Sequence, residues 1–195
     1  PGSVKRLLVV ALMQPVKGIP HLLNAVSQIR AIRTDVTLGI VGDGPPRATY
    51  EKMARDLGLD EAVRFHGLAP KQRVAELMRE SDLLVVPSLT ETFCVVAAEA
   101  LASGLPVVAT RCGGPEEFIN ETCGLLVPPG DPSALADAIN TVIDNLDSYS
   151  REDMANYARQ QFGQEAVGSM LHETYSELTR LKSSPLASSH TGSDR

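Results

Sequence analysis

Six short apolar runs, each separated from the next by an amphipathic stretch, dominate the sequence. The runs are rich in Leu and Val and lie at residues 6–12, 36–41, 62–65, 83–86, 106–109 and 124–127. They are apolar almost without interruption, and such runs are typical of strands covered on both faces in a parallel sheet. The regular alternation therefore predicts an α/β domain: a doubly wound parallel sheet of about six strands with helices on both faces.

The stretches between these runs are expected to form helices, because apolar residues recur in most of them at i, i+3, i+4 and i+7. They lie at residues 19–33, 47–57, 71–80, 93–103, 115–120 and 133–147, and two further helices are expected near 151–161 and 164–182. We expect residues 4–182 to form one domain. Residues 1–3 resemble a processing or cloning remnant, and residues 183–195 are a polar tail that cannot bury enough surface to become ordered.

The charge balance and the cysteine count disfavour several classes of protein. The 195 residues carry 24 acidic and 18 basic side chains, a net charge of −6, so no basic excess favours binding to nucleic acid. No apolar run reaches the roughly 18 residues of a membrane span, and the N-terminal residues do not resemble a signal peptide. Three cysteines without a C-x-x-C pair (Cys94, Cys112 and Cys123) favour reduced thiols, and therefore a cytoplasmic protein, over disulfides or a zinc site.

The loops after the first three strands each permit a ligand site or an ordinary turn. Ligands of doubly wound sheets bind outside the carboxyl ends of the strands. The first loop holds Lys17 beside Gly18, either a charge for a phosphate or a solvated lysine, and it lacks the glycine patterns of NAD-binding and P-loop proteins. Gly42, in the second loop, permits a tight turn or a close approach to a ligand. Residues His66–Leu68, in the third, offer bare backbone to a flat heterocycle or form a plain turn.

The loop after the fourth strand carries the strongest of these signals. Thr92 is a good N-cap residue, so we expect the next helix to begin at Phe93. The amides of Phe93, Cys94 and Val95 would then lack partners within the helix and would form a receptor for an anion or a hydroxyl group.

Two acidic residues flank this predicted receptor. Glu91 precedes it, and Glu99 lies about 10 Å further along the helix axis at 1.5 Å per residue. This separation excludes a close acid/base dyad, so the two carboxylates contact separate parts of a long ligand, such as two polyol groups. The alternative is a helix with acidic surface residues.

Several ordered motifs together resemble the C-terminal, donor-binding domain of retaining GT-B glycosyltransferases, the large group typified by glycosyltransferase family 4. The motifs are the E-x7-E spacing of Glu91 and Glu99, the ALASGLPVVAT run at 100–110, the GGPEE loop at 113–117, the GLLVPPGD segment at 124–131, Lys17-Gly18, and the VGDGP segment at 41–45. The likeness covers about residues 6–180. It implies a single Rossmann-like half of a GT-B enzyme that binds a nucleotide-diphospho-sugar.

The resemblance also implies a role for each matching position. Lys17 would neutralise the diphosphate as the nucleoside diphosphate departs, and Glu91 would hold hydroxyls of the transferred sugar. The amides of residues 93–95 would meet the sugar and the distal phosphate, and Glu99 would bind the ribose. The backbone at 66–68 would contact the edge of the base. The resemblance thus implies a donor site formed by Lys17, Gly42, His66, Leu68, Glu91, Phe93, Cys94, Val95 and Glu99.

The implied donor is a UDP-, GDP- or ADP-sugar, and the sequence does not distinguish between them. No metal or other cofactor is expected, because members of the family use protein cations and helix ends to hold the phosphates.

Two positions depart from the family pattern. Leu12 stands where the family has an arginine that pairs with the lysine on the diphosphate. Loss of one charge-assisted contact costs roughly 1.5–3 kcal/mol, about 10- to 150-fold in affinity, unless Arg47 or Arg111 replaces it. Pro115 also lies one position earlier than in the usual Gly-Gly-x-Pro-Glu loop. Leu12 is the best argument for the alternative function, a nucleotide-sugar-binding module without catalysis.

The resemblance covers only one half of a GT-B enzyme. Such an enzyme closes two Rossmann-like domains on a cleft, and the N-terminal domain supplies the acceptor site. We therefore expect that the chain binds a nucleotide-sugar, that its partner is an N-terminal acceptor-binding domain, and that the chain alone transfers no sugar.

Overall fold

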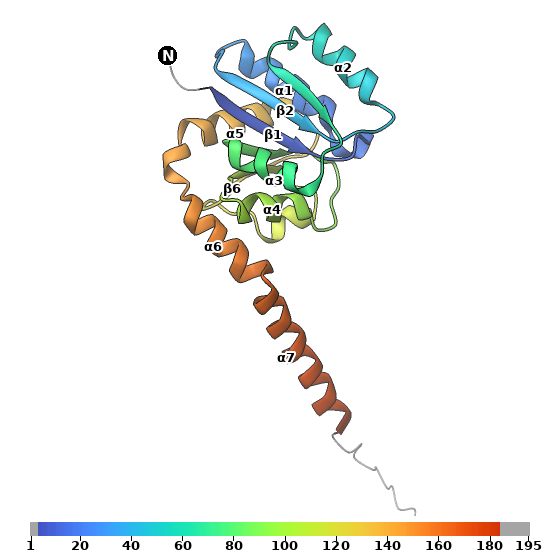
Figure 1. Ribbon diagram of the computed structural model, residues 1–195, viewed down its shortest axis with the longest axis vertical. Coiled ribbons are helices and arrows are strands. Elements are labelled where there is room, and N and C mark those ends of the chain that lie inside the picture. The colour runs from blue at the N-terminus through green and yellow to red at the C-terminus, as the bar shows by residue number, and fades with distance from the viewer. Residues whose placement is uncertain (1–3, 184–195) are drawn as a thin grey trace, which may run out of the picture. The chain divides into compact units, whose positions relative to one another are not determined.

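The computed structural model describes residues 4–183, and its α/β unit is built on one six-stranded parallel sheet (Figure 1). The strand order is β3-β2-β1-β4-β5-β6. The strands are β1 (Lys5–Val10), β2 (Val36–Val41), β3 (Val63–Gly67), β4 (Leu83–Val86), β5 (Val107–Thr110) and β6 (Gly124–Val127). The predicted doubly wound α/β fold, with its sheet of about six strands, is confirmed.

Three strands differ by one or two residues from the apolar runs. β1 ends at Val10, before the predicted end at residue 12, although the amides of Ala11 and Met13 still donate to the carbonyls of Val41 and Asp43 at 3.0 and 2.8 Å. β3 extends to Gly67, which pairs with Val41. His66 is therefore a strand residue.

Helices cover both faces of the sheet. The helices of the described residues are α1 (Ile19–Arg30), α2 (Arg47–Asp56), α3 (Lys71–Glu80), α4 (Val95–Ala102), α5 (Pro132–Asp144), α6 (Arg151–Phe162) and α7 (Gln164–Ser183), with short 3-10 turns η1 (Pro15–Lys17), η2 (Gly114–Glu117) and η3 (Leu146–Ser148). α1 packs against α2 and α5 in one layer, whereas α3 and α4 contact the central strands from the other face. The helix predicted at 115–120 is only the turn η2.

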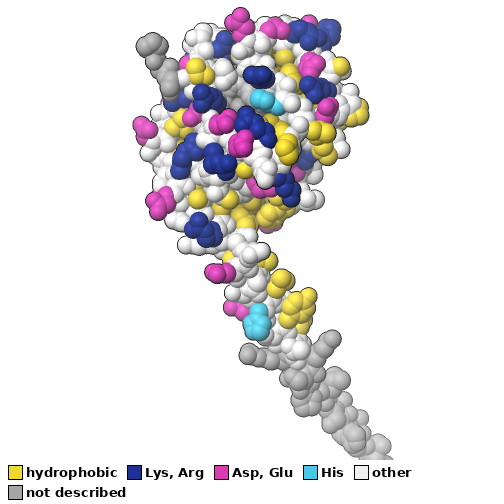
Figure 2. Space-filling view, viewed as in Figure 1, with side chains coloured by type: hydrophobic (Ala, Val, Ile, Leu, Met, Phe, Trp, Pro, Cys, Tyr) yellow, Lys and Arg dark blue, Asp and Glu magenta, His cyan; other side chains and the backbone are white. Residues whose placement is uncertain are grey.

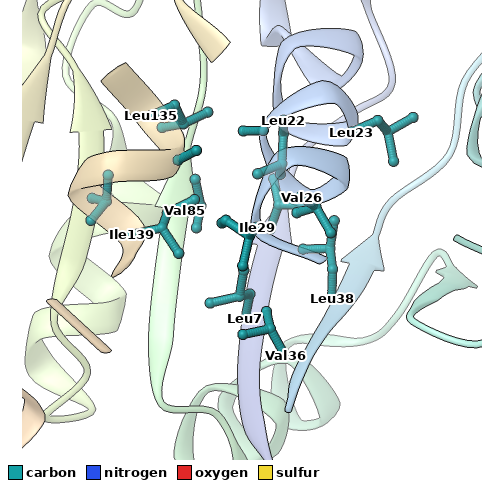
Figure 3. Close-up of a cluster of buried hydrophobic side chains, with 14 of the residues drawn as sticks. Leu7, Leu22, Leu23, Val26, Ile29, Val36, Leu38, Val85, Leu135 and Ile139 are labelled. Carbon is teal, nitrogen blue, oxygen red and sulfur yellow. The ribbon is translucent and has the colours of Figure 1, made fainter. Parts of the chain in front are cut away.

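The main core lies between β1, β2, β4 and the layer of α1 and α5 (Figure 3). Leu22, Val26 and Ile29 recur at i, i+4 and i+7 on one face of α1, and each is fully buried. They pack against strand residues such as Leu7 and Leu38, so the amphipathic period of α1 matches the apolar face of the sheet. Burial of each such side chain contributes about 1.5–3 kcal/mol.

The compact α/β unit ends at Ala158, and a second unit begins at Arg159. Within that second unit, α7 exposes apolar side chains that include Met170, Leu171 and Tyr175. Ser183 closes α7; the rest of the predicted tail and the predicted remnant at 1–3 lie outside the described residues. Among residues 4–183, no helix has the length and apolarity needed to cross a membrane.

The face of the molecule in Figure 2 mixes both signs of charge. Lys and Arg side chains lie there among Asp and Glu side chains, with a histidine near the upper middle. This face therefore presents no continuous basic stripe of the kind that follows a phosphate backbone.

The carboxyl edge of the sheet depends on a close backbone contact at Gly42. Gly42 has a φ of 133°, and a Cβ atom there would lie 1.8 Å from the carbonyl oxygen of Ala11. We expect Gly42→Ala to destabilise the fold by about 3 kcal/mol or more, because it adds a backbone clash to the left-handed strain. Urea denaturation followed by circular dichroism measures the free energy of unfolding.

Gly58→Ala is the matched control for this experiment. Gly58 also has a positive φ of 68°, but a Cβ atom there would meet nothing within 4 Å. It should cost only about 1 kcal/mol, the penalty of the left-handed conformation. Equal losses of unfolding free energy in the two variants would show that the contact with Ala11 is unimportant.

Candidate functional site

The loop after β1 lies directly against the loop after β4. Gly18 has a left-handed φ of 66°, and a Cβ atom there would lie 1.9 Å from the carbonyl oxygen of Pro87. The amide of Leu89 donates to the carbonyl of Val16 at 2.7 Å, which joins the same two loops. This close approach, which requires glycine at position 18, brings Lys17 beside the residues that follow β4.

The backbone of Glu91 is held from the other side by the loop after β5. Its amide donates to the carbonyl of Cys112 at 2.8 Å, and its carbonyl accepts from the amide of Gly114 at 3.1 Å. Glu91 and Gly113 form an isolated parallel bridge. The β4 loop, which carries Glu91, and the β5 loop therefore fix the backbone position of this residue together.

The side chains of Lys17 and Glu91 meet in a partly buried ion pair. Nζ of Lys17 lies 2.7 Å from Oε1 of Glu91, and the two side chains are 24% and 13% exposed. The hydroxyl of Ser88 donates to the same Oε1, also at 2.7 Å. In the described part of the chain, no hydrogen bond reaches Oε2 of Glu91, so this oxygen is available to accept from a ligand.

These side chains line a pocket of about 330 Å³ at the carboxyl edge of β1 and β4. Its lining includes polar residues from both loops and apolar residues from the strands and the start of α4: Leu12, Gln14, Lys17, Val86, Ser88, Glu91, Thr92, Phe93, Cys94, Val95 and Val96. A concave site with apolar walls and a few converging polar groups is typical of small-molecule sites. The cation suits a phosphate oxygen, and the carboxylate suits a hydroxyl group.

The prediction that α4 begins at Phe93 with Thr92 as its N-cap is wrong. The helix begins at Val95, and its N-cap is Cys94, in the left-handed conformation with a φ of 68°. Tertiary contacts hold the residues before Cys94 in a non-helical conformation. Glu91 forms a bridge with the β5 loop, and the rings of Phe93 and Phe118 lie 5.6 Å apart. A sharp turn at Cys94 is therefore needed before the helix can form.

The structure brings five of the nine predicted site residues together. Lys17, Glu91, Phe93, Cys94 and Val95 all line the pocket, and Gly42, His66, Leu68 and Glu99 do not. Glu99 lies within α4 with an exposed side chain.

The other three lie on or after β2 and β3. Gly42 directly follows β2, and its amide donates to the carbonyl of Gly67 at 2.8 Å. Leu68 is exposed just after β3. His66 lines a separate hollow between β3 and α3, where partial burial and the charges of Arg64 and Arg73 lower its pKa below the usual value.

Ser88 is the site residue that sequence reasoning missed. It is 2% exposed, although it is polar and lies in the loop. The sequence offered one signal for it, a hydroxyl residue three positions before Glu91 in the same loop. It does not show, however, that this hydroxyl points toward the carboxylate.

The thiols near the site are buried and free among the described residues. Burial raises the pKa of the Cys94 thiol to about 12. It is therefore a poor nucleophile at neutral pH, since the thiolate is the reactive form. In the described part of the chain, no cluster of three or more His, Cys, Asp or Glu side chains forms a metal site.

The left-handed backbone at Cys94 generates a stability prediction. Cys94→Ala removes the thiol and keeps a Cβ atom in the strained conformation, whereas Cys94→Gly removes both. The glycine variant should be more stable than the alanine variant by about 1 kcal/mol, because left-handed backbone costs other residues roughly this much. Chemical denaturation of the two variants gives the difference, and an alanine variant of equal or greater stability would contradict the argument.

Comparison with known proteins identifies the family. The family model described as glycosyl transferases group 1 matches residues 1–161. The chain is 35% identical over 188 residues to a D-inositol 3-phosphate glycosyltransferase of Corynebacterium efficiens, covering 92% of this chain and 44% of the relative. It is also 35% identical over 133 residues to an MMP alpha-(1->4)-mannosyltransferase of Mycolicibacterium hassiacum, covering 67% of this chain and 32% of the relative.

Solved structures agree with this assignment. The Anabaena protein Alr3699/HepE in complex with UDP-glucose superposes with a TM-score of 0.78 at 29% identity, covering 89% of this chain and 49% of that one. Sucrose-phosphate synthase from Thermosynechococcus elongatus gives a TM-score of 0.80 at 30% identity, with 93% and 47% covered. The chain thus spans about half the length, or less, of the proteins it matches. The predicted resemblance is confirmed: the chain belongs to the glycosyl transferases of group 1 and has the fold of a GT-B half.

Proposed function

We propose that this chain is the donor-binding half of a retaining glycosyltransferase and that its pocket receives the sugar and diphosphate of a nucleotide-diphospho-sugar. The observation that carries the proposal is the Lys17–Glu91 pair, which places a cation and a carboxylate in one hollow at the carboxyl edge of the sheet. Ligands of doubly wound sheets bind at this edge. A similar structure holds UDP-glucose, which makes UDP the first nucleotide to test.

The geometry supports a division of roles between the two side chains. In transfer, the bond from the anomeric carbon to the diphosphate breaks, and its electron pair remains on the departing oxygen. The Lys17 ammonium stabilises that developing charge, and Oε2 of Glu91 accepts hydrogen bonds from sugar hydroxyls. An acceptor hydroxyl then bonds to the carbon on the face that the diphosphate left and gives its proton to the departing phosphate oxygen, so the configuration is retained.

The nucleoside end of the donor extends beyond this pocket in our proposal. Gly42 and Gly67 hydrogen-bond to each other, so the loops after β2 and β3 are neighbours at the same edge of the sheet. This arrangement supports a role for the backbone at 66–68 in contacting the base. Glu99, exposed on α4, is proposed to bind the ribose hydroxyls.

The acceptor site belongs to a second domain in this proposal, so the chain alone binds a donor and transfers nothing. The alternative is a nucleotide-sugar-binding module without catalysis. The exposed Leu12 at the pocket favours this alternative, since it offers no charge to the diphosphate. Joining the chain to an N-terminal domain of a relative and assaying hexosyl transfer separates the two.

Calorimetric titration of the chain with UDP tests the proposed phosphate contact. Lys17→Ala should weaken UDP binding by roughly 10- to 150-fold, the value of one charge-assisted contact. Lys52→Ala is the matched control: it removes the same charge from an exposed lysine of α2 that pairs with Asp56, and it should change affinity by less than about 2-fold. Equal affinity of the Lys17 variant and the wild type would exclude the assignment.

Leu12 offers a gain-of-binding test. Leu12→Arg adds a cation at the pocket and should strengthen UDP binding by roughly 10-fold, because a second charge then faces the diphosphate. Ile32→Arg adds the same charge at an exposed position outside the pocket and should change the affinity by less than about 2-fold. The same titration checks both variants, and no gain in the Leu12 variant would show that the diphosphate lies elsewhere.

A further inference from the structure

Ser88 places a buried hydroxyl directly on the Glu91 carboxylate. Ser88 is 2% exposed, and its Oγ donates to Oε1 of Glu91 at 2.7 Å. Lys17 donates to the same oxygen from the other loop, also at 2.7 Å. One carboxylate oxygen therefore receives two donors, and the other receives no hydrogen bond from the described residues.

The donor hydroxyl is itself held by its surroundings. Ser88 follows β4 by two residues, and its carbonyl accepts a hydrogen bond from the hydroxyl of Thr110 at the end of β5. Thr110 is also 2% exposed. Two adjacent strands thus anchor the serine, and a short side chain on an anchored backbone has few alternative positions.

Lys17 alone does not orient the carboxylate in this way. An ammonium group is a compact charge on a flexible stem of four carbons, so it can follow the glutamate into several rotamers. A buried hydroxyl on a short stem accepts fewer arrangements. The direction of the Glu91 carboxylate therefore depends on Ser88, whereas Lys17 compensates the negative charge of the carboxylate.

We propose that Ser88 is a positioning residue for donor binding: it fixes Oε1 of Glu91 and so points Oε2 at the hydroxyls of the transferred sugar. This inference rests on the proposed function, because it needs a sugar in the pocket. It adds a prediction that the proposed function does not make, namely that a residue without ligand contact controls recognition of the sugar and not of the nucleoside diphosphate.

The test compares UDP-glucose with UDP on the full 195-residue chain by calorimetric titration. Ser88→Ala should weaken UDP-glucose binding by about 10-fold, the effect of one hydrogen bond to a charged group, and UDP binding by less than about 2-fold. Ser88→Cys, similar in size but a weak donor, should behave like Ser88→Ala. Ser88→Thr, which keeps the hydroxyl, should restore most of the UDP-glucose affinity.

Ser81→Ala controls for the loss of a buried serine hydroxyl. Ser81 is 6% exposed, and its hydroxyl donates to the carbonyl of Leu77 at 2.7 Å, outside the pocket. This variant should leave the ratio of the two affinities unchanged, and thermal unfolding of every variant reports its stability. If Ser88→Ala does not fold, Ser88→Cys decides the question.

The outcomes separate the inference from the function on which it rests. A wild-type chain that binds neither UDP nor UDP-glucose overturns both. A wild type that binds both ligands, with Ser88→Ala or Ser88→Cys weakening them equally or not at all, overturns the positioning role and leaves the proposed donor site standing. A selective loss of UDP-glucose affinity that threonine reverses supports the inference.

Discussion

The contact between the loops after β1 and β4 is the constraint on which the site depends. Lys17 and Glu91 are 74 residues apart in the chain, and their side chains meet because Gly18 allows the backbone to approach Pro87. A side chain at position 18 would force the two loops apart. The pocket, its cation and its carboxylate therefore all depend on a contact between two pieces of backbone.

The ion pair in this pocket contributes little to the stability of the fold, which agrees with the role in ligand binding that we propose for it. Exposed pairs contribute about 0–1 kcal/mol, and the desolvation of a buried pair offsets much of its attraction. Lys17 and Glu91 are only partly buried, and both side chains line the pocket. A ligand with both anionic and hydroxyl groups can use the two charges together, whereas the fold gains little from them.

The turn at Cys94 shows how tertiary contacts override a local signal. Thr92 is a good N-cap, yet the helix begins at Val95, because the bridge between Glu91 and Gly113 keeps the preceding chain out of the helix. N-cap preference contributes about 1 kcal/mol, which several backbone and ring contacts outweigh. The helix therefore begins two residues later than predicted, although Phe93, Cys94 and Val95 still line the pocket.

The sequence by itself determined the parallel sheet of about six strands, the alternation of strands and helices along the chain, and the edge of the sheet where a ligand site is expected, because burial on both faces leaves a continuous apolar pattern in each strand. It also singled out Lys17 and Glu91. The order of the strands within the sheet came from the structure. Only the tertiary structure decided that their side chains touch, that Ser88 shares the same oxygen, and that His66 faces a different hollow. Side-chain direction in a loop depends on contacts between residues far apart in the chain, and the apolar periodicity of the sequence does not reveal such contacts.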